Sequence, residues 1–337
     1  MTMLDHLKEH FVKEFPRIAS GHYIHLFVLR HSQSFPVFQT DGVLNTARTQ
    51  AGLTKHRDLF NRLVMFKRKQ TTPERLTGRE LLRALDITSQ AKDAENYCAY
   101  NGEDSCKQCP DCILYGFAIG DSGAERSKVY SDSAFSLTPY ETSHQSMTFN
   151  APSEAGAMSE GGVMRHSINE QDHVIPEITF PVVETLRDVT YEGFIYLVGN
   201  LLRTRRYGAQ ESRTGTMTNH LVGIAFCDGE VFSNLRLTQA LYDRLENPEQ
   251  ILGIDGLKLL AETTVRELLA EEPVRQTRVL FGDELAEIMK DVKSLYQDNE
   301  AIAAILTTLN QQTHHYAQTH GAKAKPTQKN TKKNSKK

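Results

Sequence analysis

The sequence is notable first for what it lacks, since it has no tryptophan, no long apolar run and no familiar catalytic motif. No stretch approaches the roughly 20 uncharged apolar residues that cross a bilayer, which excludes a membrane-spanning helix. The start, MTMLDHLKEHFVKEF, lacks the basic and then apolar pattern of a signal peptide and predicts an amphipathic helix with Leu4, Leu7, Phe11 and Phe15 on one face. We therefore expect a cytoplasmic protein without a membrane partner.

The sequence also lacks familiar groups of catalytic residues. Histidines and acids are scattered, without an HExxH, GxSxG or DxD pattern, and the phosphate-binding pattern GxxxxGK[ST] is absent. These absences argue against a metalloprotease, a serine hydrolase and a nucleotide hydrolase. We expect no catalytic residues and a protein that is not an enzyme.

What the chain does have is a dense cysteine cluster, YCAYNGEDSCKQCPDCILYG, which holds four of its five cysteines. Cys106, Cys109 and Cys112 stand at strict two-residue spacing, which suits one tetrahedral ion. Cys98 is the first candidate for a fourth ligand and His144 the second. A closed set of four protein ligands is structural, and in a reducing compartment zinc is favoured, with an iron–sulfur cluster or a disulfide as alternatives.

Charge is distributed unevenly along the 337 residues. Residues 1–83 hold 14 lysines and arginines against 7 acids, whereas residues 240–300 hold 14 acids against 7 bases. The segment 321–337 carries seven lysines and no acid, and we expect it to be a disordered tail. This polarity allows one basic face for a polyanion and an acidic face elsewhere. A solvated surface is the alternative explanation.

The hydrophobic patterns predict a mixed α and β protein (α+β), and the length allows one large elaborated domain or two ordinary ones. Polar, Gly- and Ser-rich residues at about 138–173 indicate a functional loop, a projecting hairpin or a disordered insertion. The alternation of strands and helices suits a ferredoxin-like sheet, the architecture of RNA-recognition domains. Strands are predicted at 21–38, 61–70, 127–137, 174–186 and 219–229, and helices at 76–87 with Thr77 as N-cap, after Thr190, and over most of 238–316.

Two basic segments are candidates for nucleic-acid contacts. The loop LLRTRRYGAQESRTGTM, residues 201–217, crowds arginines among glycines, Ser212 and threonines, and Tyr207 offers a face for base stacking. The second segment runs from Arg48 through Arg62 to Lys69. On a strand, Lys67 and Lys69 would point to one face and Arg68 to the other, which argues against a single patch.

The ordered combination of these features resembles the crRNA-binding backbone subunit of type I CRISPR effector complexes, most closely of type I-D (Cascade), in the RAMP superfamily. The residues that carry it are SKVYSDSAFSL with Asp132, Ser133 and Ala134, the hairpin and return strand from Met147 to Val182, the loop RTRRYGAQESRTGTM and the cysteine insertion. The resemblance spans roughly residues 20–316.

The resemblance implies a single modified RNA-recognition domain over residues 1–320, with a cysteine-rich metal-binding insertion at about 88–126. Copies of the chain would polymerise head to tail along crRNA as a filament for antiviral defense. Target nucleic acid would pair with the guide RNA, and the hairpin would wedge into the guide. Other CRISPR effector subunits would be partners. The implied wedge residues are Phe149, Met158 and Met164. The implied RNA-binding residues are Arg48, Lys55, Arg57, Lys67, Lys69, Arg203, Arg205, Arg206, Tyr207, Ser212 and Arg213.

Two alternatives remain. Relatives in type III systems cut RNA with an aspartate in an N-terminal loop, and Asp41 lies in such a loop, which would make the chain a metal-dependent endoribonuclease. One acid without a second carboxylate or base is a poor phosphodiester site. The other alternative is a zinc-dependent protein-interaction module that touches no RNA.

Overall fold

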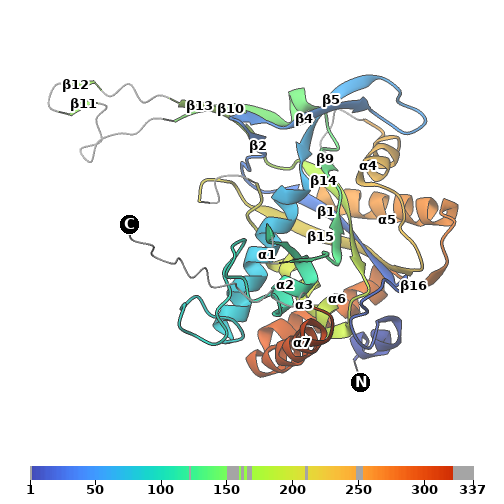
Figure 1. Ribbon diagram of the computed structural model, residues 1–337. Helices are drawn as coiled ribbons and strands as arrows, with labels where there is room; N and C mark the ends of the chain where they lie inside the picture. Colours follow the sequence, from blue (N-terminus) through green and yellow to red (C-terminus); the bar gives the residue numbers. More distant parts are fainter. Residues whose placement is uncertain are drawn as a thin grey trace, which may run out of the picture.

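The computed structural model describes residues 2–120, 123–149, 159–160, 163–164, 169–208, 212–247 and 253–321. At its centre lies a five-stranded antiparallel sheet with the strand order β16-β15-β1-β14-β8 (Figure 1). These strands are β1 (Tyr23–Ser32), β8 (Val129–Ser131), β14 (Thr179–Arg187), β15 (Met217–Cys227) and β16 (Gln276–Leu280).

The apolar run of β1 explains why helices cover both faces of this sheet. Leu26 and Val28 point into one hydrophobic core, whereas Phe27 and Leu29 point into a second core on the opposite face. A strand buried on both faces reads as a continuous apolar run rather than as an alternation. The first core contains side chains of η1 (Leu4–His10), α1 (Lys67–Ala84), α2 (Pro110–Tyr115), α3 (Tyr191–Arg203), α6 (Gly282–Gln297) and α7 (Asn299–His320). The second contains side chains of α4 (Asn234–Tyr242) and α5 (Ile254–Glu271).

Smaller strands surround the central sheet. A ribbon of β10 (His144–Phe149) and β13 (Asn169–Val174) projects from the body at the upper left of Figure 1, and β11 (Ser159–Glu160) pairs with β12 (Val163–Met164). A three-stranded sheet joins β4 (Thr46–Gln50), β5 (Leu59–Met65) and β9 (Ala134–Phe135). The remaining elements are β2 (Gln39–Thr40), β3 (Val43–Leu44), β6 (Phe117–Ala118), β7 (Ala124–Glu125) and η3 (Tyr140–Thr142).

Several sequence predictions are confirmed. Leu4, Leu7, Phe11 and Phe15 are all buried as predicted, although the predicted helix is the short η1, which ends at His10 before Phe11 and Phe15. The hydroxyl of Thr190 accepts a hydrogen bond from the Gly193 amide, which caps α3 as expected. The ribbon of β10 and β13, from His144 to Val174, coincides closely with the segment predicted as a projecting hairpin.

Among the described helices, none has both the length and the apolar character that a bilayer span requires.

The predicted strand at 61–70 and helix at 76–87 are wrong in their boundary. The strand ends at Met65, and a helix runs from Lys67 to Ala84 through Pro73, so Thr77 is inside the helix rather than its N-cap. Tertiary contacts explain the difference. Gln70 donates to the carbonyls of Met65 and Asp132, and Glu74 binds Arg30 of β1, so two buried polar side chains fix the first two turns against the sheet.

Two other predicted strands are divided. The strand expected at 127–137 is split at Asp132, whose carbonyl accepts from Gln70 and Asn234, so β8 joins the central sheet and β9 joins β5. The strand expected at 174–186 is broken at Glu177, which has a φ of 67°. The final helical run is divided at Asp298, whose carboxylate accepts from the amides of Glu300 and Ala301 and so begins α7.

Candidate metal centre and nucleic-acid interface

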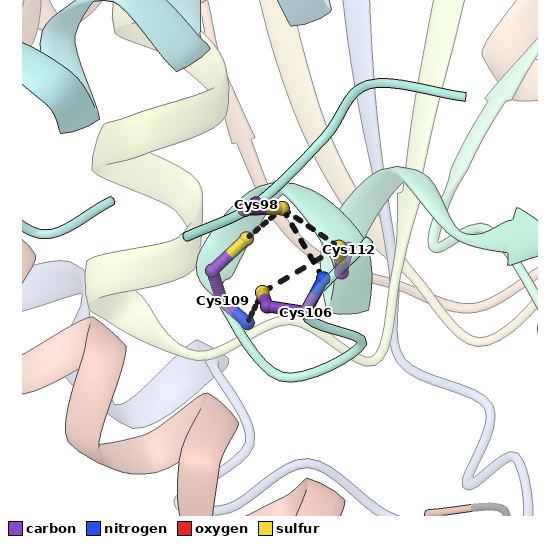
Figure 2. Close-up of side chains that lie close together, drawn as sticks. All are labelled: Cys98, Cys106, Cys109 and Cys112. Atoms are coloured by element: carbon purple, nitrogen blue, oxygen red, sulfur yellow. Dashed lines mark hydrogen bonds between the residues drawn. The ribbon is translucent and has the colours of Figure 1, made fainter. Parts of the chain in front are cut away.

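The four clustered cysteines converge on one point (Figure 2). Their sulfur atoms all lie within 4.8 Å of one another. Sγ of Cys98 is 3.8 Å from that of Cys109 and 3.7 Å from that of Cys112, and the Cys106 and Cys112 sulfurs are 3.9 Å apart. Four thiolates at a Zn–S length of about 2.3 Å in a tetrahedron would have sulfurs about 3.8 Å apart. The donor set and its spacing therefore fit one tetrahedral ion.

Local backbone features make this arrangement possible. Pro110 begins the short helix α2, which places Cys112 on its first turn, and Lys107 has the positive φ of 62° that the turn between Cys106 and Cys109 requires. The Cys109 amide donates to the Cys106 sulfur at 3.3 Å. Hydrogen bonds from the Cys106, Cys109 and Cys112 thiols lower the pKa of Cys98, which favours a thiolate in the cluster.

The fourth position belongs to Cys98 and not to His144. Nδ1 of His144 is 2.8 Å from the Tyr140 carbonyl oxygen, and its ring stacks on Tyr140, so the side chain is engaged away from the cluster. Cys227 lies buried in β15, and burial raises the pKa of its thiol to about 12, as suits a small apolar side chain.

The cysteine centre is fastened to α1 by two arginines. Arg79 donates to the Cys98 carbonyl at 2.6 Å and to the carboxylate of Asp111 at 2.7 Å. Arg75 makes two further bonds to Asp111, at 2.7 and 3.0 Å. Asp111 is fully buried, and it is the acid between Cys109 and Cys112. The ion pairs therefore link the cysteine-bearing loop to the helix that also carries the basic turn.

The first turn of α1 carries Lys67, Arg68 and Lys69 and no acid. Cations at a helix N-terminus oppose the helix dipole, at a cost of about 0.3–1 kcal/mol each. In the described part of the chain, none of the three forms an ion pair with an acid. This uncompensated charge is placed where an anion would be bound favourably.

Two hollows flank this turn. The first, of about 720 Å³, lies between α1, β8 and the segment before α4, and its basic lining is Lys67, Arg68, Arg75 and Arg126, opposed by Asp132 and Glu230. The second, of about 550 Å³, lies between α1 and residues 204–208, and its basic lining is Arg68, Lys69, Arg205 and Arg206, opposed by Glu80. Arg68, Thr72 and Tyr100 line both hollows.

The structure thus brings together residues that the sequence analysis kept apart. Lys67 and Lys69 lie on a helix, so the strand alternation that separated them from Arg68 does not apply. Arg205 and Arg206 reach the same place from the loop after α3. Tyr100 and Arg126 also line this surface and were missed, because nothing in their local sequence indicates proximity to α1.

Other predicted contacts lie elsewhere. Arg48 is exposed on β4, and Lys55 and Arg57 are exposed in the β4–β5 loop, where the Asp243 carboxylate accepts from four consecutive amides. That loop lies outside both hollows. Arg203, Ser212 and Arg213 are exposed too, with the Arg203 guanidinium 5.6 Å from the ring of Tyr296.

Two expectations are corrected by burial. Tyr207 is fully buried, and its hydroxyl donates to Glu74 at 2.8 Å, so it offers no face for base stacking. Arg62 is also buried and donates to the Ser136 and Leu137 carbonyls, which makes it a structural residue. Of the predicted wedge residues, Met158 lies outside the described residues, and only the backbones of Phe149 in β10 and Met164 in β12 are described.

The nuclease alternative gains no support at Asp41. This exposed residue lies in the turn between β2 and β3, with a φ of 55°. Among the described residues, the cysteine centre is the one group of three or more metal-ligating side chains.

Fold and site together define a mixed α and β protein that combines a mainly antiparallel sheet, a four-cysteine centre and a basic surface. The profile of the Csc2 family, described as Csc2 Crispr, matches residues 10–306. The chain belongs to this CRISPR protein family.

Solved structures share the fold. The crystal structure of Thermofilum pendens Csc2 is 14% identical, with a TM-score of 0.60, and the match covers 95% of this chain and 98% of that one. A chain of a CRISPR RNA-guided surveillance complex, pre-nicking, is 10% identical, with a TM-score of 0.51, over 81% of this chain and 99% of the other. No curated protein matches the sequence.

Proposed function

We propose that this chain is a guide-RNA-binding backbone subunit of a type I-D CRISPR effector complex. The observation that carries the proposal is the convergence of Lys67, Arg68 and Lys69 with Arg205 and Arg206 on one hollowed surface. An RNA backbone presents regularly spaced phosphates, and such a cluster of unpaired cations attracts it. Membership of the Csc2 CRISPR family supports guide RNA as the RNA to be bound.

The core suits this role. The order β1-α1-β8-β14-α3-β15 is a β-α-β-β-α-β order, which supports a modified RNA-recognition core within a single domain over residues 1–320. The insertions at about 88–126 and 138–173 then carry the metal centre and the projecting ribbon. The Lys-rich tail, 321–337, falls almost wholly outside the described residues.

Successive copies would line up head to tail along the guide. The ribbon of β10 and β13 would separate the guide into segments, with Phe149, Met158 and Met164 as wedge candidates, and target nucleic acid would pair with the exposed bases. The excess of bases in residues 1–83 and of acids in residues 240–300 supplies opposite charges for contacts between copies. Other effector subunits would cap the filament, and no step requires catalysis by this chain.

The cysteine centre would hold zinc. Four thiolates at tetrahedral spacing are a closed donor set, which leaves no open position for substrate. The ion would serve to shape the loop that Arg75 and Arg79 attach to α1.

Fluorescence anisotropy with labelled single-stranded RNA tests the proposal. The double variant Arg205→Ala/Arg206→Ala should bind more weakly, and the slope of log affinity against log salt should fall by about 1.4, since each phosphate contact contributes about 0.7. The matched control Arg244→Ala/Arg275→Ala removes two arginines that pair with surface acids, Glu267 and Asp228. Equal slopes for the wild type and the Arg205/Arg206 variant would contradict the proposed interface.

A further inference from the structure

The junction between the two basic hollows is occupied by an aromatic side chain from the cysteine-rich loop. Tyr100 lines both hollows and keeps 37% of its surface exposed, which is unusual for a large side chain in this molecule. It lies two residues after Cys98, on the loop that the cysteine centre closes. Its position between two cationic hollows places an aromatic ring along the path that a polyanion would follow.

Two arginines of α1 contact the ring of Tyr100. The guanidinium carbon of Arg75 lies 5.2 Å from the ring centroid and that of Arg79 lies 5.6 Å away. Both arginines are fixed by the fully buried carboxylate of Asp111, and Arg79 also bonds to the Cys98 carbonyl. The ring is therefore oriented by a network that includes the cysteine centre, so little freedom remains to be lost when a ligand stacks on it.

We propose that Tyr100 is a base-stacking residue, on which one unpaired base of the bound RNA lies where the two hollows meet. Phosphates on either side of that base would lie against the basic linings, with Lys67 and Arg126 in one hollow and Arg205 and Arg206 in the other. Single-strand binding sites combine cationic grooves with aromatic platforms in this way. The inference rests on the proposed function and adds to it the contact that orients a base.

A second consequence concerns the cysteine centre. Because Arg79 bonds to the Cys98 carbonyl and contacts the Tyr100 ring, the centre would support RNA binding by holding the loop that presents Tyr100. The sequence analysis gave the stacking role to Tyr207, which is buried; the structure places Tyr100, not Tyr207, at the basic surface.

The test compares three substitutions at position 100 in the full chain, purified with its metal, using anisotropy with labelled single-stranded RNA. Tyr100→Ala and Tyr100→Leu should weaken binding about 5- to 150-fold, equivalent to about 1–3 kcal/mol for one stacked base. Tyr100→Phe keeps the ring and should bind within about twofold of wild type. The salt slope should be the same in all of them, because no charge is removed.

The pattern of outcomes separates the inference from the proposed function. If Tyr100→Ala binds as wild type while Arg205→Ala/Arg206→Ala is weakened, the stacking role is wrong and the RNA interface stands. If the wild-type chain shows no affinity for RNA under these conditions, both fail. A Tyr100→Phe variant as weak as Tyr100→Ala would also overturn stacking, since it would assign the effect to the hydroxyl.

A measurement on the wild-type chain avoids dependence on the folding of a variant. RNA containing 4-thiouridine would be photo-crosslinked and the protein digested with trypsin. The peptide 93–107, which lies between Lys92 and the cleavage after Lys107, should carry a nucleotide adduct. Adducts on other peptides and none on 93–107 would contradict the inference.

Discussion

Arg79 donates a hydrogen bond of 2.6 Å to the carbonyl oxygen of Cys98, and a second nitrogen of the same guanidinium lies 3.5 Å from the Cys98 sulfur. One buried side chain thus joins the cysteine centre to α1, the helix that carries the basic turn. The cysteine centre and the candidate RNA surface are parts of one network, although 28 residues lie between Lys69 and Cys98 in the sequence.

The purified protein should contain one zinc ion per chain. The four thiolates form a closed, structural site, and the free energy of binding a structural ion contributes to the stability of the fold. Removing the ion with a chelator should therefore lower the melting temperature. Elemental analysis and a thermal melt check both points. Cys112→Ser should lose the metal, whereas Cys227→Ala, at the cysteine outside the cluster, should keep it. A metal-free wild type with an unchanged melting curve would refute a structural zinc site.

Asp111→Asn should destabilise the protein strongly. The buried carboxylate pairs with both Arg75 and Arg79, so its loss leaves two guanidinium groups without their counter-charge, at a cost of about 3–5 kcal/mol. Denaturant unfolding measures the effect. The control Glu262→Gln removes the acid of an exposed helix pair with Arg266 and should cost under about 0.5 kcal/mol. Similar midpoints for the two variants would show that the buried network does not hold the loop.

The pH dependence of stability should change in Glu184→Gln. Burial, and then repulsion from Glu74, raise the pKa of Glu184 to about 8, from 4.5, although Arg30 opposes the shift. A raised folded-state pKa contributes stability that is full below about pH 4.5 and lost as the pH rises through about 8. Wild type should therefore lose stability relative to Glu184→Gln between pH 5 and pH 8.5.

Melting temperatures across that range test this expectation. The control is Glu246→Gln, a change at an exposed glutamate, which should track the wild type at every pH. If the melting temperature of Glu184→Gln also follows that of the wild type, the expectation is wrong. The Glu184 carboxyl would then be ionised across this pH range, and the buried Arg30 would lie between two charged carboxylates, Glu74 and Glu184.

Asp243→Asn should loosen the β4–β5 loop. The carboxylate accepts from the amides of Leu53, Thr54, Lys55 and His56, and an amide nitrogen in its place would face those donors. These bonds are only partly buried, so we expect a local loosening of the loop rather than a large loss of global stability. Hydrogen exchange at residues 53–56 should accelerate, while the control Asp255→Asn, at an exposed helix start, should leave it unchanged. Unchanged protection in Asp243→Asn would mean that the loop is held by other contacts.

The parts that could be predicted from the sequence are those with local causes. Three features could be predicted from a few neighbouring residues. They are the cysteine cluster, from the spacing of Cys106, Cys109 and Cys112, the buried strand β1, from its apolar run, and the start of α3, from its cap at Thr190. The predictions were wrong where a residue distant in the sequence determines the local structure. Gln70 and Glu74 keep Lys67–Lys69 helical through bonds to Asp132 and Arg30, and Tyr207 is buried by its bond to Glu74.

The same reason explains why Tyr100 was overlooked. Its ring contacts Arg75 and Arg79, which lie more than 20 residues earlier in the chain and are near it only in the folded structure. A tyrosine in a polar loop gives no local signal of this placement. Three-dimensional proximity, rather than residue type, separates it from the chain's other tyrosines.

The most direct test of the central claim is to express the chain with and without a CRISPR array, together with its partner subunits, and to analyse the RNA that copurifies. Because the chain has no tryptophan, bound RNA would dominate the absorbance, and a raised 260/280 nm ratio would reveal it. The account predicts a large particle that carries array-derived RNA, and its loss in Arg205→Ala/Arg206→Ala. An RNA-free chain from the complete set of subunits, with the array expressed, would contradict it.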